Sequence, residues 1–312
     1  MIISASRRTD IPAFYSAWFM NRLTEGYALV HNPRSPQRLG RVELSPDKVD
    51  CIVFWTKNPL PMFAVLDALD RMGYKYYFEF TLTPYDRRIE RNLPPKERLV
   101  ETFQTLSERI GPNRVDWRYD PILISENFPL AYHLEQFEKL SGVLHSKTKR
   151  CIISFADQYR HVKSVPCIQH EAVLAVAEGF SRIAQSYGLP LLTCAETASL
   201  EQFGIAHAAC IDKGKVESVI GAAIKAKKDD GQRPACGCIA SVDIGAYDTC
   251  SHGCAYCYAT TSTELVARRM RAHAPESPLL TGFPKGDELV TDRTSGSQKL
   301  QQLTLFPFEN GK

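Results

Sequence analysis

The feature that most constrains the fold is a regular alternation of short apolar segments and longer helical patterns over the first two-thirds of the chain. The short segments are rich in β-branched and aromatic residues, and glycines follow several of the longer ones. This order is typical of parallel strands joined by crossover helices. We predict strands at 2–6, 51–56, 76–83, 115–119, 150–155 and 189–194, with helices at 10–26, 60–72, 94–110, 129–144 and 168–187.

The alternation predicts an α/β protein with a full or partial (β/α) TIM-like barrel, and 312 residues are enough for one such domain. A doubly wound open sheet stays an alternative, because periodicity does not determine whether a sheet closes. We expect a single barrel domain over residues 1–274. Residues 275–312 carry Pro, Gly, Ser and Thr with little patterning, so we expect an extended or partly disordered tail there.

Composition narrows the class of protein. A hydrophobic fraction of 44% and a charged fraction of 23% are those of a globular protein. The net charge of +3 gives no overall attraction to nucleic acid or to a membrane. The chain has no apolar run of about 18 residues and no signal-peptide pattern, so we expect a cytoplasmic protein with no membrane partner. In that compartment, ten cysteines indicate metal or redox chemistry rather than disulfides.

Three cysteines near the carboxyl end follow the pattern C-x3-C-x2-C, at Cys250, Cys254 and Cys257. This short spacing brings three thiolates to one side of a loop. A closed zinc site needs four ligands, and a ferredoxin cluster normally has four cysteines. Three thiolates suit a 4Fe–4S cluster that keeps one iron open to bind another group. The alternative is a zinc site completed by His252 or by an upstream cysteine.

Four further cysteines, Cys194, Cys210, Cys236 and Cys238, could converge near the first three. Four thiolates would complete a second, closed iron–sulfur cluster or a structural zinc site. The alternative is that Cys194 and Cys210 are small core residues. The Cys-Gly-Cys pair is hard to explain by packing, so we assign residues 236–259 to the metal-binding region.

Polar residues follow the predicted strands, and in (β/α) barrels the carboxyl ends of the strands carry the active site. Our candidates for binding a cofactor and a substrate are Arg118, Asp120, Ser154 and Glu196. For each of them the alternative is a turn or capping residue. Arg118 and Asp120 could equally form an internal ion pair.

The cysteine pattern, with the aromatic Tyr256 just before its last cysteine, resembles the cluster motif of radical S-adenosylmethionine (SAM) enzymes. The resemblance implies a 4Fe–4S cluster on Cys250, Cys254 and Cys257, SAM bound with Tyr256 near its adenine, and hydrogen-atom abstraction from an unknown substrate. It also implies an electron donor such as flavodoxin or ferredoxin. The glycine-rich SAM-contact segment of that superfamily has no clear counterpart here.

The place of the motif differs from the usual one, which is after the first barrel strand. Here it follows a predicted strand at 240–244 and precedes a predicted helix at 261–273, after all other strands. A circularly permuted radical SAM barrel would explain this order, with the last strand and helix in the first βα position.

The chain also resembles a narrower group, the uncharacterised bacterial proteins with a carboxyl-terminal, radical-SAM-like cysteine cluster. This resemblance supports iron–sulfur binding and implies no particular reaction. Besides the cysteine motif, it rests on Ser6-Arg7-Arg8-Thr9-Asp10-Ile11-Pro12, Trp55-Thr56-Lys57-Asn58-Pro59, Arg118-Tyr119-Asp120-Pro121 and Cys236-Gly237-Cys238.

Two other functions stay open. The first is an iron–sulfur or zinc protein that senses redox state or binds nucleic acid without SAM chemistry. The second comes from residues 302–306, Gln-Leu-Thr-Leu-Phe, which resemble the peptide by which bacterial polymerases and repair proteins dock on the DNA sliding clamp. That match would indicate DNA repair. Its alternative is a tail that packs onto the barrel.

Overall fold

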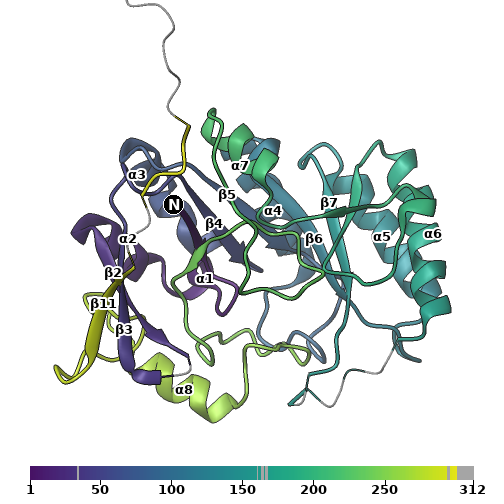
Figure 1. Cartoon of the computed structure of the whole chain (residues 1–312). Helices are drawn as coiled ribbons and strands as arrows, with labels where there is room; N and C mark the ends of the chain where they lie inside the picture. Colours follow the sequence, from purple (N-terminus) through teal and green to yellow (C-terminus); the bar gives the residue numbers. More distant parts are fainter. Residues whose placement is uncertain (34, 160, 163–164, 166–167, 294–295, 301–312) are drawn as a thin grey trace, which may run out of the picture.

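The computed structural model describes residues 1–33, 35–159, 161–162, 165, 168–293 and 296–300. Its centre is an eight-stranded sheet in the order β10-β1-β4-β5-β6-β7-β8-β9, in which all neighbouring strands are parallel (Figure 1). The strands are β1 Ile2–Ala5, β4 Cys51–Thr56, β5 Tyr76–Thr81, β6 Val115–Ile122, β7 Cys151–Phe155, β8 Leu191–Cys194, β9 Ala206–Ala208 and β10 Val242–Asp243.

The predicted α/β architecture with parallel strands is confirmed. The sheet is not closed into a barrel within the described residues, because β9 and β10 form its two edges and do not pair with each other. The strand expected before the cysteine loop is β10, and it lies beside β1.

Helices surround the sheet (Figure 1). On α4, apolar residues at 99, 103, 106 and 110 recur at helical spacing and are buried, which gives the helix one face for the core. The predicted helix at 10–26 is two helices that meet at Tyr15, and the helix expected at 60–72 begins as a 3-10 turn, η1 Leu60–Val65. The α-helices are α1 Ile11–Phe14, α2 Ser16–Glu25, α3 Leu66–Arg71, α4 Lys96–Ile110, α5 Leu130–Leu144, α6 His170–Ser186, α7 Lys213–Ile220 and α8 Thr263–Arg271; η2 Pro112–Arg114 and η3 Glu201–Phe203 are 3-10 turns.

The two faces of the central strands differ in chemistry, since successive side chains point to opposite sides of a strand. In β6, Trp117 and Tyr119 join the main apolar core. The residues that alternate with them are Asp116, Arg118 and Asp120, so the opposite face of the same strand is charged. This alternation directs Arg118 and Asp120 away from the main core.

The structure also contains a smaller sheet, in the order β11-β3-β2, which the sequence analysis did not predict. It contains β2 Tyr27–Asn32, β3 Ser35–Glu43 and β11 Leu289–Arg293. β11 belongs to the part of the chain that we assigned to an extended tail, yet it runs parallel to β3. Nearby, the indole N–H of Trp18 donates to the carbonyl of Ser277 at 2.9 Å, and Leu279 and Leu280 are buried. Residues 277–293 therefore pack onto the domain.

Within the described residues, no helix has both the length and the apolar character needed to cross a membrane.

Candidate functional site

A cavity of about 470 Å³ lies at the carboxyl ends of the strands. Its walls include residues that end or follow β1, β4, β7 and β8, for example Asp10, Lys57, Ser154 and Cys194. Both cysteine groups open onto it. The polar strand ends noted in the sequence thus surround one space, whose volume is typical of a small-molecule site.

The loop cysteines, which are Cys250, Cys254 and Cys257, all line this cavity and are partly buried. Their loop is fixed by hydrogen bonds to the segment after β5: the backbone N–H of Asn92 donates to the carbonyl of His252 at 3.0 Å, and that of Ala255 donates to the carbonyl of Ile89 at 2.8 Å. Burial raises the pKa of the Cys254 thiol to about 12, although Lys57 acts in the opposite direction. Without a cation the Cys254 thiol is therefore neutral at pH 7.

His252 is 3% exposed and lies within the cysteine loop. Its Nε2 lies 2.7 Å from Oδ2 of Asp10, while its Nδ1 is buried without a hydrogen-bond partner. Asp10 also accepts from the backbone N–H of Ala13 at 2.9 Å and from that of Lys57 at 2.7 Å. One carboxylate thus caps α1 and links the strand ends of β1 and β4 to the cysteine loop.

Glu90 is buried beneath the cysteine loop and joins four side chains. It accepts hydrogen bonds from Lys57 at 2.8 Å, from Thr83 at 2.9 Å, and from Lys96 and the Tyr256 hydroxyl. Burial alone would raise the pKa of this carboxyl, but the two ammonium groups lower it to about 2. Tyr256, which was predicted to lie near a cofactor, lines the cavity. Its hydroxyl is bonded to Glu90, and its ring lies 5.3 Å from the Lys57 ammonium.

The four-thiol group consists of Cys194, Cys210, Cys236 and Cys238, and the structure brings all four together. The sulfur atoms of Cys194 and Cys210 are 2.8 Å apart. The Cys238 sulfur accepts from the backbone N–H of Ile211 at 3.4 Å, and Cys236 belongs to the same buried cluster. The four side chains are buried and line the cavity.

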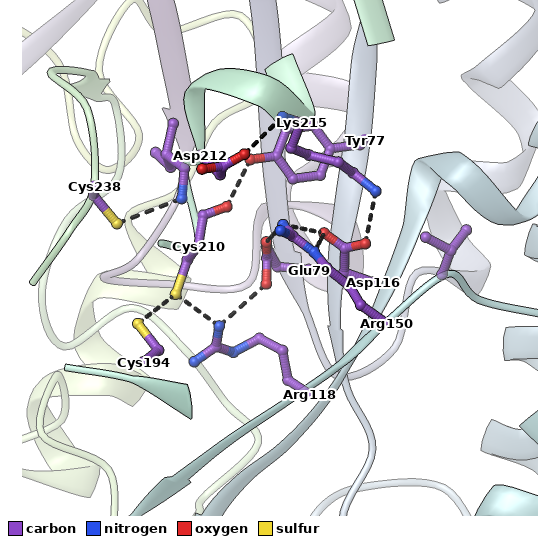
Figure 2. Close-up of polar contacts among 12 residues, drawn as sticks. Tyr77, Glu79, Asp116, Arg118, Arg150, Cys194, Cys210, Asp212, Lys215 and Cys238 are labelled. Atoms are coloured by element: carbon purple, nitrogen blue, oxygen red, sulfur yellow. Dashed lines mark hydrogen bonds and ion pairs between the residues drawn. The ribbon is translucent and has the colours of Figure 1, made fainter. Parts of the chain in front are cut away.

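Arg118 connects the four-thiol group to the charged face of the sheet (Figure 2). Its Nη1 donates to the Cys210 sulfur at 2.8 Å and to Glu79 at 3.1 Å, and its Nε donates to Asp120 at 3.1 Å. Despite burial, the neighbouring Cys210, Asp120 and Glu79 hold its pKa well above the usual value. The ion pair expected as one alternative for Arg118 and Asp120 is therefore present, on the cavity wall.

Asp120 and Ser154 lie together on the same wall, where the Ser154 hydroxyl donates to Asp120. Burial would raise the pKa of Asp120, but Arg118 and Ser154 lower it. Glu196 is different, because it is outside the cavity lining and accepts from the backbone N–H of Phe155 at 2.8 Å. Burial raises the pKa of Glu196 to about 7.

A second set of buried charges lies on the sheet behind Arg118 (Figure 2). Asp116 binds Lys215 at 2.6 Å and Arg150 at 2.7 Å, while the Tyr77 hydroxyl donates to the carbonyl of Cys210 at 2.7 Å. These contacts support the four-thiol group from behind. They belong to the packing of the sheet, because none of these side chains lines the cavity.

No group of three or more His, Cys, Asp or Glu side chains in the described part of the chain is arranged so that it could hold a metal ion. For the four-thiol group the spacing gives the reason. Four thiolates bound to zinc stand about 3.8 Å apart, which is the edge of a tetrahedron with bonds of about 2.3 Å. The Cys194 and Cys210 sulfurs, at 2.8 Å, would have to move apart by about 1 Å to accept an ion.

Sequence reasoning missed Lys57 and Glu90 as residues of this site. Lys57 lies in a polar strand end that the sequence makes visible, but nothing there distinguishes it from a turn residue. Glu90 comes between a strand and a helix in a charged segment and gives no signal of its own. Residues 302–306, proposed as a clamp-binding peptide, lie outside the described residues.

Comparisons with known proteins show the family to which the chain belongs, and they indicate no activity. No curated protein matches the chain. Among solved structures, one named "putative alpha-L-fucosidase" from Bacteroides thetaiotaomicron VPI-5482 is 11% identical, with 73% of this chain and 83% of that chain covered. Its TM-score is 0.26, so the likeness carries no argument about function. A family model matches residues 2–259, which include both cysteine groups, and the chain therefore belongs to the family described as DUF1848, a domain of unknown function.

Proposed function

We propose that the protein is a radical SAM-type enzyme in which Cys250, Cys254 and Cys257 hold a 4Fe–4S cluster. The observation that carries the proposal is that three thiols of one loop open onto a 470 Å³ cavity at the carboxyl ends of a parallel sheet. The donor set fits the group, because three thiolates leave one iron of a cubane free for SAM. When bound, such a cluster supplies the electron that cleaves SAM and starts hydrogen-atom abstraction.

The strand order supports a permuted radical SAM fold with a partial barrel, because β9 and β10 do not pair within the described residues. β10 lies beside β1, the cysteine loop follows β10, and α8 follows the loop. This is the order of a first βα unit of the superfamily moved to the end of the chain. We therefore infer that the residues beyond the carboxyl ends of the strands receive both SAM and the substrate.

Residues of the cavity have suitable chemistry for these ligands. Asp120 stays ionised because Arg118 and Ser154 stabilise its charge, so it can accept hydrogen bonds from an ammonium or hydroxyl group. Lys57 and Arg8 line the cavity and can pair with a carboxylate. The hydrogen bonds of residues 89–92 and of Asp10 hold the cysteine loop in place before any ligand binds. Electrons would come from a donor such as flavodoxin or ferredoxin.

A second candidate, a zinc protein without SAM chemistry, draws on one specific observation. His252 holds Asp10 through Nε2 and leaves Nδ1 buried without a partner, which is the arrangement of a histidine that binds a metal. With the loop cysteines it would form a closed site of three cysteines and one histidine. A closed zinc site would have no position for SAM.

Reductive cleavage of SAM distinguishes the two candidates. The protein is purified and reconstituted without oxygen, reduced with dithionite and incubated with SAM, and 5′-deoxyadenosine is measured by chromatography. We expect turnover for the wild type and for the control C51A/C151A, which removes two core cysteines, and none for C250A/C254A/C257A. Zinc at the loop cysteines and no 5′-deoxyadenosine from the wild type would establish the second candidate instead.

A further inference from the structure

Two cysteines of the four-thiol group form a close pair at the carboxyl ends of neighbouring strands. Cys194 is the last residue of β8, which pairs in parallel with β9 and places Cys194 beside Ala208. Cys210 is the second residue after β9, and its sulfur lies 2.8 Å from that of Cys194. A disulfide bond is about 2.05 Å long, so an approach of less than about 1 Å would join the two sulfurs.

Contacts on the side of the sheet hold Cys210 in this position. The Tyr77 hydroxyl donates to its carbonyl at 2.7 Å, and Arg118 donates to its sulfur at 2.8 Å. Cys194 is held as part of β8. Because the fold fixes both residues before any reaction, little conformational freedom is lost when their sulfurs bond.

The pair can be reached from the cavity. Cys194 and Cys210 are 7% and 3% exposed, and both line the 470 Å³ space. Cys51 and Cys151 differ, because they are completely buried and are not part of the cavity lining. A small reagent that enters the cavity therefore reaches the pair and not these two core thiols.

The contact between the two sulfurs also makes their acidities unequal. The hydrogen bond from Cys210 lowers the pKa of Cys194 to about 7, although burial acts in the opposite direction. The same contact raises the pKa of Cys210 well above its usual value. Unequal thiols suit the two steps of thiol–disulfide exchange, because the first attack requires a thiolate.

We propose that Cys194 and Cys210 form a redox-active dithiol, which a small disulfide entering the cavity converts to an internal disulfide. The Cys194 thiolate attacks one sulfur of the small disulfide, forms a mixed disulfide and releases the first small thiol. The Cys210 sulfur then loses its proton, attacks the Cys194 sulfur and releases the second small thiol. Two electrons and two protons thus pass from the protein to the small disulfide, and a small dithiol reverses the exchange.

Peptide mapping by mass spectrometry tests the proposal on the full chain, purified without oxygen and reduced beforehand. The protein is treated with hydroxyethyl disulfide, and the remaining thiols are alkylated under denaturing conditions before digestion. We expect a Cys194–Cys210 disulfide with loss of both alkylation sites, and recovery of both sites after dithiothreitol. Cys51 and Cys151 should stay fully alkylated in the same sample, which makes them an internal control.

Variants separate the pair from the other cysteines of the cavity. The proposal uses none of the loop cysteines and does not depend on the function proposed above, so C250S/C254S/C257S should form the same disulfide. C210S should stop at a mixed disulfide between Cys194 and the small thiol, because the second attacking sulfur is missing.

Three results would overturn the proposal. The first is a treated wild type in which Cys194 and Cys210 both stay alkylated. The second is a disulfide that joins Cys236 and Cys238 and leaves the pair reduced. The third is a metal ion in the purified wild type that protects the pair from the reagent and whose removal exposes it, which would make the two cysteines ligands. All three are read from the wild type, so the test holds even when a variant does not fold.

Discussion

The buried carboxylate of Glu90 gives a direct test of how the cysteine loop is held. Its side chain is fully buried and pairs with Lys57 and Lys96. Removing one partner of a buried ion pair costs about 3 to 5 kcal/mol, because the remaining charge is left without compensation. Glutamine keeps the shape of the side chain and an oxygen that accepts from Thr83, and this hydrogen bond offsets about 1 kcal/mol of that cost. We therefore expect E90Q to lower the free energy of unfolding by about 2 to 4 kcal/mol.

The assay is urea unfolding at pH 7, followed by circular dichroism on metal-free protein so that cluster loss does not contribute. The control is E135Q, which removes an exposed ion pair with Lys139 on α5 and should cost less than about 0.5 kcal/mol. The same preparations, reconstituted with iron, should show weaker iron retention in E90Q, since Glu90 bonds Tyr256 within the cysteine loop. Equal unfolding midpoints for E90Q and E135Q would show that the reasoning about this carboxylate is wrong.

Two further predictions concern the core and a buried histidine. F137A removes a ring stacked on Phe180 at 3.9 Å, so it should lower the free energy of unfolding by about 3 to 5 kcal/mol, measured by urea denaturation; a loss below 1 kcal/mol would contradict this packing. Burial lowers the pKa of His133, so its neutral form stabilises the fold above pH 6.5 and this stability is lost as the pH falls through the folded-state pKa. The difference in unfolding free energy between wild type and H133Q should therefore shrink from pH 7 to pH 5, and a constant difference would refute it.

Local patterns predicted the central sheet well because each buried strand carries its own signal. The segment Cys51–Thr56 was predicted with the bounds that the structure gives to β4. The break at Tyr15 between α1 and α2 has a tertiary cause, since the Tyr15 hydroxyl donates to the carbonyl of Thr249 at 2.6 Å. β11 escaped prediction because its residues are exposed and its partner β3 lies about 250 positions earlier in the sequence.

The candidate site, like the fold, was predicted from the sequence only in part. The position of cysteines near strand ends allowed the four-thiol group to be foreseen, since the carboxyl ends of parallel strands meet at one edge. The links between Asp10 and His252 and between Lys57 and Glu90 join positions 242 and 33 residues apart, and no local pattern reports such pairs. In the sequence, the charged face of β6 appeared only as an alternation of charged and aromatic residues. Its contacts with Glu79 and Cys210 required the fold.

The central claim is that the loop cysteines hold a cluster with one iron free to bind SAM. Electron paramagnetic resonance of the anaerobically reconstituted, dithionite-reduced protein, recorded with and without SAM, tests it most directly. The account predicts a reduced 4Fe–4S signal that changes when SAM is added and that is absent from C250A/C254A/C257A. A cluster signal that SAM does not alter, or zinc with no iron signal at all, would contradict it.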